Sequence, residues 1–307
     1  MPEVSWVHGF GALKILNLPI YSIFNQSELD RQYSPSSCVK NIDLYLNRYT
    51  EVSRIVKKSA LESNTCLCDL AYGPSGDERL DLFLPPTKGL APLQIYIHGG
   101  YWQALSKADS LFAAPLFQQH GACFAALNYG LAPHVTLTEI VAQVRRAICW
   151  LYAHAGRLKF DHERIYLSGS SAGAHLAIMM LMTDWPEFGL PEQVIKGVCA
   201  VSGIYDLEPI RLSYVNELLG MDASEAALNS PMRQRIRNHC PLILAYGDNE
   251  TGEFKRQTDE YRDQLLDSGF PVCFKEIRDR NHFDVIMDLS DPNAWLSQQV
   301  LEQMGLI

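Results

Sequence analysis

From about residue 65 onward, short runs rich in β-branched and aromatic residues alternate with longer helical patterns. This alternation is typical of an α/β fold with a mostly parallel sheet and helices on both faces, because parallel strands need a helical crossover between them. We expect eight strands, at 66–72, 79–84, 93–98, 122–128, 164–168, 195–201, 241–246 and 272–277. We expect helices near 107–120, 136–155, 172–183, 253–268 and 293–304. The turn residues 73–76 (GPSG) predict an antiparallel hairpin of the first two strands at one edge.

The domain organisation that we expect is a single unit spanning residues 1–307, since α/β sheets of this size often form one domain. Residues 1–62 are expected to form an N-terminal arm and a helical segment; the helical part, 28–62, packs over the sheet or forms part of a lid. Segment 10–24 is apolar but interrupted by polar residues and a proline, so we interpret it as part of the arm rather than a signal peptide. Residues 205–240 are irregular and predict an insertion near a pocket.

The charge and the cysteines narrow the class of protein. A net charge of −9 without a long run of Lys or Arg argues against nucleic acid or an anionic membrane as partner. There is no stretch of about 18 uninterrupted apolar residues, which a membrane helix would need. Most of the eight cysteines lie in apolar segments, and Cys66 and Cys68 have no second pair at zinc-ligand spacing. We therefore expect a cytoplasmic protein with reduced thiols and no metal; a homodimer is compatible with the sequence.

A nucleophilic serine is predicted where the fifth strand candidate ends. Residues 169–173 read Gly-Ser-Ser-Ala-Gly, a G-x-S-x-G pattern between a strand and an apolar helix. This context is typical of the nucleophile elbow of the α/β-hydrolase fold. The central position of the pattern belongs to Ser171, with Ser170 as the neighbouring hydroxyl.

An oxyanion hole is predicted after the third strand, where residues 98–102 read His-Gly-Gly-Tyr-Trp. Acyl transfer needs backbone N–H donors that are held in place before the reaction. We assign these donors to Gly100 and Tyr101, together with Ala172 of the elbow, and interpret His98 as an anchor of the loop. Tyr101 and Trp102 are expected to bind the substrate by lining the pocket.

The base and the acid should follow the serine in the order acid, then histidine. His282 is the histidine that directly follows the last strand candidate, which makes it the predicted general base. The acid is expected in the loop after strand 241–246, where Asp248 and Glu250 both occur. Spacing alone leaves both open.

Taken together, several segments resemble the kynurenine formamidases, a family of α/β-hydrolases. The similar segments are LDRQYSPSS (29–37), HGGYWQ (98–103), YGLAP (129–133), SAGAHLA (171–177), TDW (183–185), VSGIYDLEPI (201–210), NSP (229–231) and EFKRQ (253–257). In that family the acid precedes E-F-x-R-Q by three residues, a register that selects Glu250 over Asp248. This chain departs from the family in two places, since vertebrate members usually carry Asp at the position of Glu250 and commonly His at that of Ser170.

The resemblance implies hydrolysis of N-formyl-L-kynurenine to kynurenine and formate in tryptophan catabolism. It implies a small acyl or formyl arylamine as substrate and no cofactor. A carboxylesterase or amidase acting on short acyl esters would use the same triad, because contacts with the leaving group decide the substrate. A more distant alternative is an inactive hydrolase fold that serves as a binding module.

Overall fold

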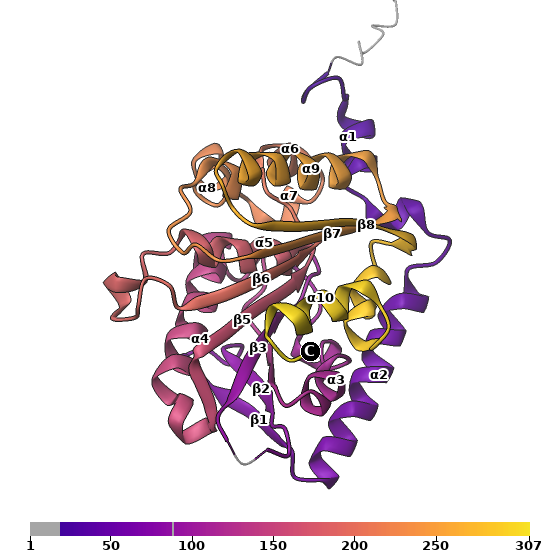
Figure 1. The fold of residues 1–307 in the computed structure, drawn as a ribbon. Coiled ribbons are helices and arrows are strands. Elements are labelled where there is room, and N and C mark those ends of the chain that lie inside the picture. Colours follow the sequence, from indigo (N-terminus) through magenta and orange to yellow (C-terminus); the bar gives the residue numbers. More distant parts are fainter. Residues whose placement is uncertain (1–18, 88) are drawn as a thin grey trace, which may run out of the picture.

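One eight-stranded sheet organises the molecule (Figure 1). The computed structural model describes residues 19–87 and 89–307, so the first 18 residues of the expected arm lie outside the described residues. The strand order is β1-β2-β4-β3-β5-β6-β7-β8. The strands are β1 (Cys66–Ala71), β2 (Arg79–Phe83), β3 (Ala91–Ile97), β4 (Cys123–Leu127), β5 (Phe160–Ser170), β6 (Ile195–Val201), β7 (Leu242–Asn249) and β8 (Val272–Asn281).

The strand pairing confirms the expected α/β-hydrolase fold. Strand β2 pairs antiparallel with both β1 and β4, and all other neighbouring strands are parallel. The predicted hairpin is therefore present, with β1 at the edge. The strands from β3 to β8 run parallel to one another, so they all end at the same edge of the sheet. The loops after β3, β5, β6, β7 and β8 therefore meet at that edge.

Helices cover both faces of the sheet. They are α1 (Gln26–Gln32), α2 (Asp43–Glu62), α3 (Ala114–Gln119), α4 (Leu137–Leu158), α5 (Ala172–Met179), α6 (Glu208–Leu212), α7 (Asn216–Leu219), α8 (Ala223–Leu228), α9 (Gly252–Asp267) and α10 (Trp295–Gln303). Short 3₁₀ helices are η1 (Pro35–Cys38), η2 (Lys107–Asp109), η3 (Met180–Met182), η4 (Trp185–Phe188), η5 (Pro231–Arg233) and η6 (Val285–Ser290).

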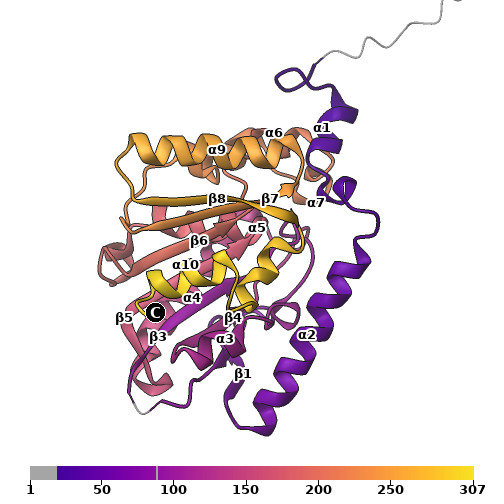
Figure 2. The ribbon, with the colours of Figure 1, turned by 45° about the vertical axis from the view of Figure 1, so that its right-hand side comes forward.

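An apolar core lies on each face of the sheet, between the strands and the helices that cover them. In β3, Ile95 and Ile97 pack into the core that also contains α4, α5 and α9, whereas Tyr96 packs into the core with α2, α3 and α10. Both faces are thus buried, which explains why the central strands read as continuous apolar runs rather than alternating ones. Figure 2 shows α2 as a long helix along one side of the molecule and α9 alongside β8.

The helix expected at 107–120 is the main departure from the predicted elements. The structure divides it into η2 and α3. Pro115 is favourable only in the first turn of a helix, so α3 begins at Ala114 rather than continuing from η2. Between the two elements, the N–H of Leu111 donates to Oγ of Ser53 in α2, 3.0 Å away. The interruption turns Phe112 into a loop residue.

Helix α2 packs over one face of the sheet. Tyr49 and Ala60 of α2 are buried in the same core as α3 and α10. Residues 205–240 form the short helices α6 to α8 and η5. No helix in the described ranges is long and apolar enough to cross a bilayer.

Candidate active site

Ser171 occupies a sharp turn between β5 and α5. Its backbone lies at φ 57° and ψ −121°, a region that residues with a side chain rarely adopt. The N–H of Ser171 donates to the carbonyl of Val201 at the end of β6, 2.9 Å away. The turn demands glycine on both sides, because a Cβ on Gly169 would lie 2.3 Å from the carbonyl oxygen of Gly173. A Cβ on Gly173 would lie 2.0 Å from the carbonyl oxygen of Ile97.

Gly173→Ala is expected to destabilise the fold by about 1–3 kcal/mol, because the added methyl meets a backbone oxygen that cannot rotate away. Gly156→Ala is the matched control, since that glycine also lies in a helix and its Cβ would have no heavy atom within 4 Å. The control should gain up to about 1 kcal/mol from helix propensity. Urea unfolding of both variants measures the two shifts, and equal stability of Gly173→Ala and wild type would contradict the tight packing of the elbow.

His282 and Glu250 form a buried hydrogen-bonded pair. Nδ1 of His282 lies 2.8 Å from Oε2 of Glu250, and both side chains are at most 5% exposed. The other carboxylate oxygen, Oε1, accepts from Oγ of Ser202 at 2.6 Å and from the N–H of Gly247 at 2.7 Å. Because an ionised carboxylate only accepts, Nδ1 carries the hydrogen and Nε2 is left to act as a base. The additional length of Glu relative to Asp is accommodated by these two anchors.

Asp248, the other acid of this loop, is placed differently. Its side chain is exposed, and its Oδ1 accepts from the backbone N–H of Arg280 at 3.3 Å. Its own carbonyl accepts from Nζ of Lys255. The geometry therefore favours Glu250 over Asp248 as the partner of His282.

The turn after β3 lies next to Ser171, since a Cβ on Gly99 would be 3.3 Å from the Cβ of Ser171. Gly100, Tyr101 and Trp102 have φ values of 96°, 52° and 60°, so three consecutive residues are left-handed. The carbonyl of Gly100 accepts from the N–H groups of Gln103 and Ala104, which closes the turn. Within residues 19–87 and 89–307, the N–H groups of Gly100, Tyr101 and Ala172 donate no hydrogen bond, so all three remain available to an oxyanion.

His98 is fully buried beneath this turn. Its ring stacks on Tyr129 with 4.2 Å between centroids, and Nδ1 lies 2.9 Å from the carbonyl oxygen of Gly99. Burial lowers the pKa of His98 to about 4, so the ring is neutral at neutral pH. This position agrees with the expected role as a loop anchor.

The expectation that Trp102 lines the pocket is wrong. The side chain is completely buried in the core and meets His175 of α5 edge-on, with 5.0 Å between ring centroids. The left-handed turn sends consecutive side chains to different sides, so that Tyr101 lines the cavity and Trp102 does not. The hydroxyl of Tyr101 donates to the carbonyl of Tyr33, 2.6 Å away, which ties the turn to the end of α1.

Ser171 and His282 line one cavity of about 300 Å³. The described residues include no hydrogen bond between Oγ of Ser171 and Nε2 of His282; such contacts often tighten only when substrate is bound. Asp109 is the one acidic residue among the described residues that line the cavity, and no Lys or Arg is among them. The cavity is therefore mostly apolar and carries no permanent positive charge.

Three aromatic side chains that sequence reasoning missed form part of this lining: Tyr49 of α2, Tyr96 of β3 and Phe112. Phe112 stacks on Tyr49, with centroids 5.9 Å apart, and meets Tyr96 edge-on at 5.4 Å. We call these three residues the aromatic wall. Ser202, which anchors Glu250, was also missed, although a polar residue directly after the buried strand β6 is a signal that could have identified it.

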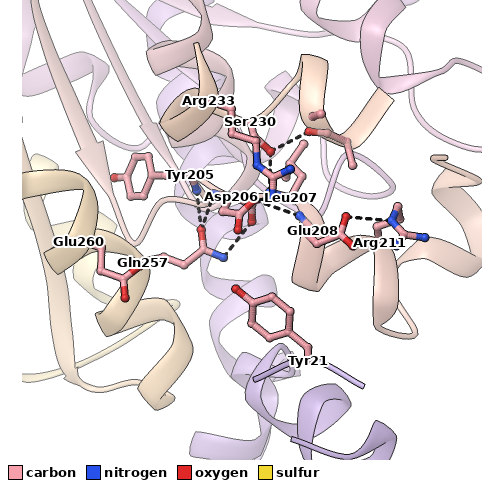
Figure 3. Close-up of polar contacts among 12 residues, drawn as sticks. Tyr21, Tyr205, Asp206, Leu207, Glu208, Arg211, Ser230, Arg233, Gln257 and Glu260 are labelled. Atoms are coloured by element: carbon pink, nitrogen blue, oxygen red, sulfur yellow. Dashed lines mark hydrogen bonds and ion pairs between the residues drawn. The ribbon is translucent and has the colours of Figure 1, made fainter. Parts of the chain in front are cut away.

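Polar contacts fix the insertion 205–240 against α9 (Figure 3). Oε1 of Gln257 accepts from the N–H groups of Tyr205 and Asp206, at 2.6 and 2.8 Å. Nε2 of the same side chain donates to the hydroxyl of Tyr33 at 2.7 Å. The insertion contributes Tyr214 to the cavity lining, so it reaches the site at that point.

Comparison with known proteins identifies the family to which the chain belongs. The BD-FAE family model matches residues 80–265. A kynurenine formamidase from Danio rerio is 37% identical over 292 residues, covering 92% of this chain and 97% of the relative. The chain belongs to the kynurenine formamidase family. A second kynurenine formamidase, from Salmo salar, is 36% identical over 92% of this chain and 97% of its own length.

A solved structure from Silicibacter sp. TM1040, assigned as a thioesterase, is also similar to this member of the kynurenine formamidase family. It has a TM-score of 0.77 and 29% sequence identity, and covers 88% of this chain and 98% of its own. The α/β-hydrolase fold and the family that the motifs indicated are thus confirmed.

Proposed function

We propose that this protein hydrolyses N-formyl-L-kynurenine to kynurenine and formate. The observation that carries the proposal is the buried Glu250–His282 pair beside the cavity that Ser171 and the aromatic wall also line. The Danio rerio relative, matched over nearly its whole length, bears the name kynurenine formamidase. The substrate is a small molecule of the acyl arylamine class.

In the proposed reaction, Nε2 of His282 takes the proton of Ser171 while Oγ attacks the formyl carbon. The oxyanion that forms accepts hydrogen bonds from the N–H groups of Gly100, Tyr101 and Ala172, which are fixed before the reaction. The protonated His282 then gives its proton to the nitrogen of the departing arylamine. Water, deprotonated by His282, attacks the formyl-serine, and formate leaves with Ser171 regenerated.

The shape of the cavity supports an aromatic leaving group. The acyl part of the substrate is only a formyl group and needs little room. The aryl ring of the leaving group is planar and apolar, and the aromatic wall offers surfaces for stacked and edge-on contacts with such a ring. Because the lining contains no Lys or Arg, an anionic acyl chain finds no charged partner there.

A second candidate function is hydrolysis of short esters or thioesters, which the likeness to the Silicibacter structure favours. The same serine, histidine and acid would serve it, so the leaving group alone separates the two functions.

The eight cysteines are free and several are buried, which supports a reducing compartment such as the cytoplasm.

The two functions are separated by kcat/KM on N-formyl-L-kynurenine and on p-nitrophenyl acetate, measured with the same enzyme preparation. We expect kcat/KM to be higher for N-formyl-L-kynurenine, although its amide bond is intrinsically less reactive than the ester. The reason is that we expect only this substrate to pack its leaving-group ring against the aromatic wall. Efficient turnover of the ester with negligible turnover of the formamide would reject the formamidase. Turnover of neither, nor of a short thioester, would favour a binding module.

A further inference from the structure

Tyr96 places a phenol in the lining of the active-site cavity. The residue lies in β3 and is 3% exposed. Its ring meets Phe112 edge-on and stacks on Phe124, with centroids 5.4 and 6.2 Å apart. These contacts hold the ring from two sides, so the position of its hydroxyl is well defined.

The hydroxyl of Tyr96 has no hydrogen-bond partner among the described residues, whereas the other tyrosines near the cavity have one. Tyr49 donates to the carbonyl of Phe283, Tyr101 to that of Tyr33 and Tyr129 to that of His98. Buried tyrosine hydroxyls usually find a partner, because leaving the group unsatisfied costs about 1–3 kcal/mol. The free hydroxyl at the cavity therefore points to a ligand atom as its partner.

The chemistry of that ligand atom follows from the surroundings of Tyr96. Burial raises the pKa of the Tyr96 phenol, so it keeps its proton and can donate. Other donors fixed around Ser171 serve the formyl oxygen, and the aromatic wall holds the ring of the leaving group. The acceptor that we assign to Tyr96 is an uncharged oxygen on a substituent of that ring, because no Lys or Arg lies in the lining to hold an anion beside Tyr96.

We propose that Tyr96 is a substrate-binding residue that donates a hydrogen bond to a carbonyl oxygen on the leaving group. The ligand class is an aryl formamide that carries a ketone beside the formamide on the ring, as N-formylkynurenine does. This inference rests on the proposed function, and it makes Tyr96 a residue that distinguishes ortho-acyl formanilides from plain formanilides.

The test compares 2'-formamidoacetophenone with formanilide. The two substrates differ only in the ortho acetyl group, which carries the ketone. Tyr96→Phe should lower kcat/KM for the ketone-bearing substrate by about 3- to 10-fold, mainly through KM, the size of one neutral hydrogen bond. The value for formanilide should remain within about 2-fold of wild type. Tyr261→Phe is the control, because it also removes a tyrosine hydroxyl without a hydrogen-bond partner, but one that is buried on a ring stacked against Tyr205 and outside the cavity lining.

Equal losses on both substrates, or the same pattern in Tyr261→Phe, would overturn the role of Tyr96. A second measurement uses the wild-type enzyme alone: 2'-aminoacetophenone should inhibit at lower concentration than aniline, and equal inhibition would also overturn it. Failure of the proposed function looks different. In that case the wild type hydrolyses no aryl formamide at all, while it still hydrolyses p-nitrophenyl acetate.

Discussion

Ser171→Ala is expected to lower kcat on N-formyl-L-kynurenine by about 10⁶-fold, the loss that follows when the nucleophile of a serine triad is removed. The residual rate would come from the oxyanion donors and from binding alone. Stability should change little, because the Ser171 side chain makes no hydrogen bond within the described residues and alanine keeps the same backbone. Ser171→Gly should be equally inactive but more stable by roughly 1–2 kcal/mol, since glycine relieves the left-handed conformation at φ 57°.

Labelling with a fluorophosphonate provides an independent measurement of the same residue. Wild type should be labelled, and both Ser171 variants should not. Ser170→Ala is the matched control, because that hydroxyl also lines the cavity but is one position away from the elbow. If Ser170→Ala abolished labelling while Ser171→Ala kept it, the assignment of the nucleophile would be wrong.

The second large effect is expected at the acid. Glu250→Gln should lower kcat by about 10⁴-fold, as loss of a triad carboxylate does when the geometry is preserved. Ser202 and Gly247 occupy one end of the side chain as donors, so the amide oxygen stays with them and the amide NH₂ faces Nδ1 of His282. A donor at that point favours the imidazole tautomer with its hydrogen on Nε2, which cannot accept the proton of Ser171.

Asp248→Asn is the comparison variant for this experiment. The exposed Asp248 accepts one long hydrogen bond from a backbone N–H, so its neutralisation should leave kcat within about 2-fold of wild type. Steady-state kinetics of both variants, with thermal melting to verify folding, measures the contrast. A loss for Asp248→Asn that exceeded the loss for Glu250→Gln would assign the acid to Asp248.

The parts of the site that local patterns predict are those with a short-range cause. The glycines on either side of Ser171 are needed for the sharp turn, and Gly99 and Gly100 indicate the turn after β3 that supplies the proposed oxyanion donors. Strand β6 matches the predicted range 195–201, because both of its faces are buried and Lys196 is the only charged residue in its apolar run. Glu250 needed the family register, since Asp248 lies in the same loop and the two acids are separated by contacts with the distant Ser202 and His282.

The aromatic wall could not be predicted because it is assembled by packing between distant segments. Tyr49 belongs to α2 and Phe112 to a loop that exists only because Pro115 delays the start of α3. Nothing in the neighbourhood of either residue indicates a cavity. The prediction for Trp102 was wrong because it relied on a sequence neighbour. Tyr101 was expected to line the pocket, which suggested the same for Trp102, but the turn directs the Trp102 side chain into the core.

The bond between Tyr33 and Gln257 joins positions 224 residues apart in the chain, and the same tyrosine holds the turn that carries the oxyanion donors. During translation, at about 5–20 residues per second, Ser171 is added to the chain before Gln257. In that interval the nascent chain contains the proposed nucleophile, but the turn that carries the oxyanion donors lacks its complete support. A chain terminated before Gln257 also lacks His282, so we expect no activity from it.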